Sequence, residues 1–66
     1  MFIKTFNGEA ILNTESISEI KIKREYKNTW NIEALITGVE RYILNVAQTE
    51  EEAKSILNDI FIAINE

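Results

Sequence analysis

The side chains that could do chemistry in this chain are carboxylates, amines and hydroxyls, because its 66 residues include no histidine and no cysteine. Those two residue types supply the commonest general base, the usual thiol nucleophile and most zinc ligands. The densest carboxylate group, Glu50-Glu51-Glu52, stands where an apolar helical repeat begins, and negative charge there stabilises a helix N-terminus. Asp59 is the only aspartate and, by helical spacing, faces away from that repeat. We therefore predict no catalytic residue, no metal site and no cofactor, and we expect a protein that is not an enzyme.

A second chemically distinctive group is basic. It consists of Lys21, Lys23, Arg24, Lys27 and Arg41. Tyr26 and Trp30 lie beside it, and basic side chains next to aromatic ones can follow a phosphate backbone while bases stack on the rings. However, Glu19, Glu25 and Glu33 interleave with the group, and the net charge of −4 disfavours nucleic acid and anionic membranes. Binding of single-stranded nucleic acid is therefore the alternative function, and a solvated strand face of mixed charge is the simpler interpretation.

The strongest structural pattern covers residues 49–64 and predicts a C-terminal helix. Thr49 is a favoured N-cap, and Glu52, three residues further on, completes a capping box. Apolar residues then recur at helical spacing, at Ala53, Ile56, Leu57, Ile60 and Ile64. A helix of this length is marginal alone in water, so its apolar stripe must cover another surface.

The N-terminal residues predict a β-hairpin. Asn7-Gly8 separates two apolar runs at 2–6 and 9–12, and both turn residues tolerate the positive φ of a type I′ turn. A two-residue turn at this point pairs Lys4 with Ile11. One face of the hairpin then carries Phe2, Phe6 and Ile11, and the other carries Ile3, Ala10 and Leu12. Because both faces are apolar, the sequence does not decide which one is buried.

Alternation of apolar and polar residues predicts three further strands, at 17–25, 30–36 and 41–47. The positions expected under the helix are Ile20, Ile22, Trp30, Ile32, Ile36, Tyr42, Leu44 and Val46. If Tyr26 faces Trp30 across the first turn, Lys23 meets Glu33 on the outer face, and this charge pair favours that register.

The strands at 30–36 and 41–47 are predicted to be joined by a turn at Gly38. Keeping the inward residues opposite one another pairs Leu44 with Ala34, and it pairs Ile43 with Leu35 on the outer face. That register requires an irregular loop or a bulge near Gly38.

Five strands followed by one helix predict a single α+β domain spanning residues 1–66. We expect an antiparallel β-meander with the C-terminal helix packed on one face. No stretch approaches the ~20 apolar residues of a membrane span, and residues 1–4 lack the apolar segment of a signal peptide. The absence of cysteine fits a reducing compartment, so we expect a cytoplasmic protein without a membrane partner.

Self-association is predicted from apolar residues that the helix leaves uncovered. Leu35 and Ile43 should be neighbours on the outer sheet face, Ile62 points opposite the helix stripe, and Phe61 sits on its flank. A chain this short buries only about 60% of the surface that it exposes when unfolded, and no disulfide compensates. We therefore expect a homo-oligomer, with a homodimer first, and a different protein partner is the open alternative.

These features together resemble a group of short proteins of unknown function from bacterial and prophage genomes, in which a strand meander precedes a C-terminal helix. The likeness is carried by the Asn7-Gly8 hairpin, the polar connector before Ile17, the two further hairpins and the helix start at Thr49-Glu50-Glu51-Glu52-Ala53. It implies a small cytoplasmic protein of bacterial or phage origin and supplies no site residues. Frequent isoleucine, asparagine and lysine resemble the usage of an AT-rich genome.

A more distant likeness is to the dimeric single-stranded-DNA-binding coactivator fold, a curved antiparallel sheet followed by one helix. The sheet face is basic in that family, whereas here the balance is acidic and lysine and glutamate are mixed on the strand at 17–25. The function that we predict is therefore that of an oligomeric accessory or regulatory protein-interaction module.

Overall fold

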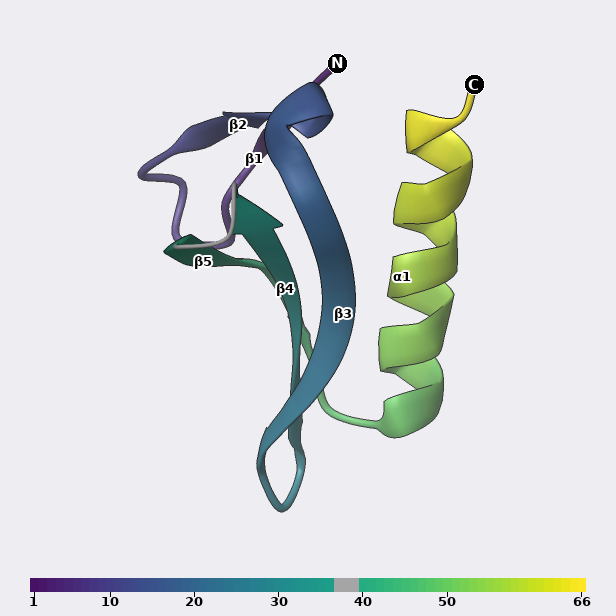
Figure 1. Cartoon of the computed structure of the whole chain (residues 1–66). Coiled ribbons are helices and arrows are strands. Elements are labelled where there is room, and N and C mark those ends of the chain that lie inside the picture. The colour runs from purple at the N-terminus through teal and green to yellow at the C-terminus, as the bar shows by residue number, and fades with distance from the viewer. Residues whose placement is uncertain (37–39) are drawn as a thin grey trace.

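The computed structural model describes residues 1–36 and 40–66, which form five strands, a short 3-10 helix and one α-helix. In chain order these are β1 (Phe2–Lys4), β2 (Ile11–Asn13), η1 (Thr14–Ser16), β3 (Ile17–Tyr26), β4 (Thr29–Ile36), β5 (Glu40–Ala47) and α1 (Glu50–Ile64). β1 and β2 form one antiparallel sheet, and β3, β4 and β5 form another with β4 in the centre. α1 runs along one face of the larger sheet (Figure 1). The α+β fold with a C-terminal helix is confirmed, with its strands divided between two sheets.

The hairpin register is confirmed, but its turn begins earlier than predicted. Lys4 pairs with Ile11, as a turn at Asn7-Gly8 requires. The Gly8 amide, however, donates to the Thr5 carbonyl at 2.9 Å, and Thr5 and Ala10 are joined by a backbone hydrogen bond of 3.0 Å. Gly8 adopts a φ of +74°, which a side chain would strain. The turn is therefore a longer loop over residues 6–9 that the Thr5 backbone closes.

The structure also decides which face of the hairpin is buried. Leu12 is buried, and Ile3 and Ala10 pack against the core. The opposite face points to solvent, and its large apolar residues Phe2, Phe6 and Ile11 are exposed. The hairpin is attached to the larger sheet by a hydrogen bond of 2.8 Å from the Phe6 amide to the Ile43 carbonyl on β5.

β3 and β4 pair in a register two residues away from the predicted one. Lys21, and not Lys23, lies opposite Glu33. One residue of the shift arises because Tyr26 pairs with Thr29 and leaves only two residues in the turn, and the other arises from an irregularity between Arg24 and Tyr26. The predicted pairing of Tyr26 with Trp30 is therefore wrong.

The side chain of Arg24 stabilises this tighter turn. Arg24 lies opposite Trp30, and its guanidinium carbon is 5.3 Å from the centre of the indole ring. Its Nη2 also donates to the Lys27 carbonyl at 3.0 Å. These contacts fix the chain reversal at Lys27-Asn28.

β4 and β5 are paired around a β-bulge at Leu44. Ile32 lies opposite Asn45, whereas Glu33 lies opposite Ile43, so Leu44 is the extra residue. The predicted pairs Leu44 with Ala34 and Ile43 with Leu35 are therefore wrong. The turn predicted at Gly38 lies outside the described residues.

The bulge exchanges the two faces of β5 beyond Leu44. Asn45 now faces α1, where it lines a cavity with Ile56 and Ile60. Val46 lies opposite Asn31 on the outer face, so the prediction that Val46 points under the helix is wrong. Leu44 itself stays buried, and the burial of this side chain accounts for the extra residue.

The core between the sheet and α1 is small. Its buried apolar residues within the described part of the chain are Leu12, Ile32, Ala34, Leu44, Ala47 and Ala53. Ile32 is the largest side chain among them that is fully buried. Ile20, Ile22 and Trp30 pack against this cluster as predicted but remain partly exposed. The single chain therefore leaves much of its predicted core in contact with water.

α1 begins at the predicted cap. Thr49 has extended backbone angles, and its hydroxyl accepts a hydrogen bond from the Glu52 amide at 3.1 Å. Among the hydrogen bonds of the described residues, the reciprocal bond from the Thr49 amide to the Glu52 carboxylate is not formed. The cap therefore depends on the hydroxyl of Thr49 alone.

Replacing Thr49 by alanine should lower the free energy of unfolding by about 1 kcal/mol, because the Glu52 amide loses its acceptor. Urea unfolding followed by far-ultraviolet circular dichroism measures this change. The control is Thr49→Ser, which keeps the hydroxyl and should unfold close to the wild type. Equal stabilities of the alanine and serine variants would show that the cap contributes nothing.

Candidate functional site

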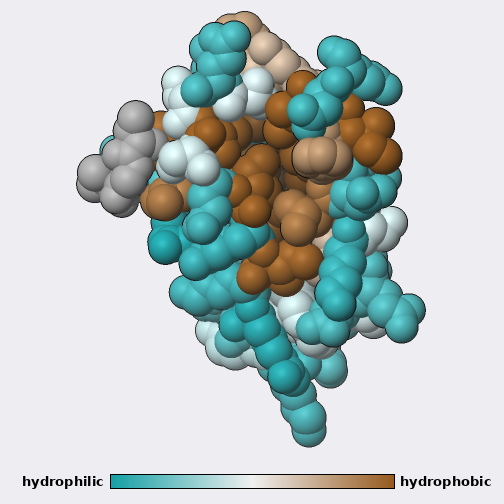
Figure 2. Space-filling view, turned by 45° about the vertical axis from the view of Figure 1, so that its right-hand side comes forward, coloured by the Kyte–Doolittle hydropathy of each residue, from teal (hydrophilic) through white to brown (hydrophobic). Residues whose placement is uncertain are grey.

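An apolar groove lies between β3 and α1. It has a volume of about 440 Å³ and is lined by Ile20, Leu57 and Phe61, with Lys54 and Asn58 as its polar lining. Figure 2, which turns the helix side of the molecule forward, shows apolar surface gathered in a hollow on this side. Phe61 is 64% exposed. The groove opens directly onto the core, because Ile20 and Leu57 also pack against its buried residues.

The strand beside this groove is a free edge of the larger sheet. Within the described residues, β3 pairs with β4 alone. The other edge, β5, is partly covered, because the Phe6 amide donates to the Ile43 carbonyl. An uncovered edge presents unpaired N–H and C=O groups to any strand that can lie beside it. The groove and the free edge therefore form one continuous surface, which we call the β3 surface.

The outer face of the sheet, away from α1, has a buried carboxylate near its centre. Glu33 is only 7% exposed, and its Oε1 lies 3.7 Å from Nη1 of Arg41. Within the described residues, that oxygen accepts no hydrogen bond. Leu35 and Ile43 lie on this face diagonally across from each other, because Leu35 pairs with Arg41 and Ile43 with Glu33.

The residues predicted for self-association are divided among different surfaces. Leu35 and Ile43 share the outer sheet face, whereas Phe61 lies in the groove. Ile62 is 50% exposed but is not part of the groove lining. Phe61 and the next residue, Ile62, therefore belong to different surfaces of α1.

The residues predicted for nucleic-acid binding are also divided. Lys21, Lys23 and Arg41 lie on the outer face, Arg24 lies on the helix face, and Lys27 lies in the turn after β3. Lys21 is opposite Glu33, and Arg41 is ion-paired with it. The Arg24 guanidinium is held by Trp30 and the turn backbone. The five side chains do not form one basic track.

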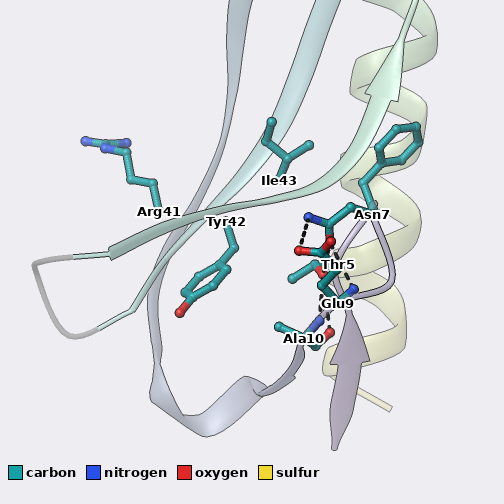
Figure 3. Close-up of a pocket in the computed structure, with 8 residues that line it drawn as sticks. Thr5, Asn7, Glu9, Ala10, Arg41, Tyr42 and Ile43 are labelled. Atoms are coloured by element: carbon teal, nitrogen blue, oxygen red, sulfur yellow. Dashed lines mark hydrogen bonds between the residues drawn. The ribbon is translucent and has the colours of Figure 1, made fainter.

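A second cavity of about 440 Å³ lies between the hairpin and the start of β5 (Figure 3). The Thr5 hydroxyl donates to Asn7 Oδ1 at 2.8 Å, and the same oxygen accepts from the Glu9 amide at 3.0 Å. Arg41 and Ile43 lie on the opposite side of β5 from Tyr42 (Figure 3). Because the hydroxyl is bonded to an amide oxygen and not to a base, this arrangement stabilises the turn and activates no nucleophile.

Tyr42 is the titratable group whose environment is most distinctive in this cavity. Its hydroxyl donates a hydrogen bond to the carboxylate of Glu40. That bond raises the pKa of Tyr42, and the carboxylate charge raises it further because it repels the phenolate. Partial loss of hydration acts in the same direction.

Comparison of this chain with protein-family models, curated proteins and solved structures found no match. Nowhere in residues 1–36 and 40–66 do three or more acidic side chains gather where they could hold a metal ion. In the same part of the chain, no helix is both long and apolar enough to cross a membrane. We therefore infer function from the surfaces themselves.

The sequence predicts the parts of the β3 surface but does not bring them together. It predicts Ile20 in the core and Phe61 on the flank of the helix. One signal could have connected them: Phe61 follows Leu57 by four residues, so both project to the same side of α1. The outward-facing Phe2, Phe6 and Ile11 had no such signal, because both hairpin faces are apolar.

Replacing Glu40 by glutamine should lower the pKa of Tyr42 toward the ordinary tyrosine value of about 10. The substitution removes the charge that opposes ionisation of the phenol. Titration of the tyrosinate absorbance, in a Tyr26→Phe background so that Tyr42 alone reports, measures the shift. An unchanged titration curve would mean that Glu40 does not control this group.

Proposed function

We propose that this protein acts by binding and not by catalysis, as a self-associating protein-interaction module. The observation that carries the proposal is the groove between β3 and α1, which exposes Phe61 beside Ile20 and Leu57, two partly buried residues that pack against the core. Clustered apolar surface with a polar rim is typical of a protein-protein interface, whereas scattered apolar side chains are ordinary. The groove is a cluster of apolar side chains with a polar rim.

The small core gives a physical reason for a partner. Small domains that cannot bury enough apolar surface usually add disulfides, a metal or a second subunit. This chain has no cysteine to form a disulfide and no cysteine or histidine to form a usual zinc site. Each additional Å² of apolar surface that a second copy covers contributes roughly 25 cal/mol. Burial of Phe61 and Ile20 between copies would thus stabilise the fold and the assembly together.

The accessory or regulatory role belongs to the same proposal. The absence of cysteine supports a cytoplasmic location, and the residue usage supports a bacterial or phage origin. The division of the basic residues, together with the ion pair of Arg41 with Glu33 and the position of Lys21 opposite Glu33, counts against single-stranded nucleic acid as the ligand.

Sedimentation equilibrium over a series of micromolar concentrations tests self-association. We expect a mass of twice the 7.6 kDa chain or a higher multiple. Phe61→Asp should shift the equilibrium to the single chain, because it places a charge in the apolar groove.

The matched control is Ile62→Asp, which introduces the same charge at the next position, outside the groove lining. It should leave the assembly intact. A wild-type mass of one chain throughout the series would contradict the proposal and would leave the groove as a docking site for a different protein.

A further inference from the structure

We propose that a second copy of this chain adds its β3 to the free β3 edge, antiparallel and around a two-fold axis at Lys21. The two three-stranded sheets then become one continuous six-stranded sheet. This inference rests on the proposed function, because it specifies how self-association takes place.

The symmetry brings the two grooves together. Two identical antiparallel strands are related by an axis perpendicular to the sheet, and such an axis keeps both α1 helices on the same face. Each groove lies between β3 and α1, so the grooves meet across the axis. Phe61 and Leu57 of each copy then cover the isoleucines of both β3 strands. The second copy closes the core that one copy leaves open.

The regular part of β3 fixes where the second strand can lie. The pairing of β3 with β4 is irregular between Ile17 and Glu19 and again between Arg24 and Tyr26, so only residues 19–24 form an even strand. An axis at Lys21 uses this even stretch, because it pairs Glu19 with Lys23 of the other copy. On the helix face it pairs Ile20 with Ile22 of the other copy.

Charge and the regularity of β3 together select this axis over its neighbours. An axis at Ile22 would place Glu19 opposite Glu25 and Lys21 opposite Lys23, and like charges directly opposite are destabilising. An axis at Ile20 would also form opposite-charge pairs, between Glu19 and Lys21, but it would pair residues 18 and 22, and residue 18 lies in the irregular part of β3. The axis at Lys21 instead forms two Glu19–Lys23 pairs of opposite charge.

The one like-charge contact in this arrangement lies beside a carboxylate in each chain. The two Lys21 side chains meet at the axis, and each lies opposite Glu33 of its own chain. Glu33 is buried, and its Oε1 accepts no hydrogen bond within the described residues. The two lysines therefore lie in one row with two Glu33 carboxylates, each of which is also ion-paired with Arg41 of its own chain.

Charge reversal tests the pairing. Glu19→Lys creates two lysine–lysine contacts in its own dimer, and Lys23→Glu creates two glutamate–glutamate contacts. Each variant alone should raise the dissociation constant of the dimer roughly tenfold. An equal mixture restores both opposite-charge pairs and should form mixed dimers with nearly wild-type affinity. Both side chains are exposed in the single chain, so neither variant should unfold it.

Sedimentation velocity measures the dissociation constants, and native mass spectrometry with one variant labelled in heavy nitrogen identifies the mixed dimer. Glu25→Lys and Lys27→Glu are the matched controls, because they change the net charge equally but lie outside the predicted charge pairs. They should leave the dissociation constant within about twofold of the wild type.

The outcomes separate this inference from the proposed function. A dimeric wild type whose affinity is unchanged by both reversals, or whose variants do not recover on mixing, would overturn the β3 pairing and leave self-association standing. A wild type that stays a single chain would overturn both. Circular dichroism of each variant ensures that any loss of association is measured on folded protein.

Discussion

The packing of α1 on the three-stranded sheet is the interaction on which the rest of the structure depends. Ala53 of the helix and Ala34 and Ala47 of the sheet are buried between the two layers. Small side chains let a helix approach a sheet closely, but they remove little apolar surface from water. The fold is therefore well defined at its centre and weakly supported at its side, where Ile20, Leu57 and Phe61 border the groove.

The N-terminal hairpin determines which edge of the larger sheet stays uncovered. It covers part of the core with Leu12 and joins β5 through the Phe6 amide, so one sheet edge is partly occupied. The β3 edge has no corresponding cover among the described residues. We therefore expect a second copy at β3, aligned by the Glu19–Lys23 pairs of opposite charge.

The sequence predicts the element order, the Thr49 cap and the hairpin register, because each depends on residues close together in the chain. The registers of the larger sheet depend on distant contacts. Side chains alternate with a period of two, so a shift of two residues leaves the same faces buried, and the pattern could not choose between Lys21 and Lys23 opposite Glu33. The bulge at Leu44 and the groove at Phe61 likewise arise only when strands and helix are packed together.

The central claim is that a second copy completes the core of the first, so that folding and association are coupled. The most direct test is the thermal unfolding midpoint, measured by circular dichroism over a wide range of chain concentrations. Coupling predicts a midpoint that rises steadily with concentration, because association stabilises the folded chain by mass action. A midpoint that stays constant across the range would contradict the claim and would show that the single chain is stable with its groove open.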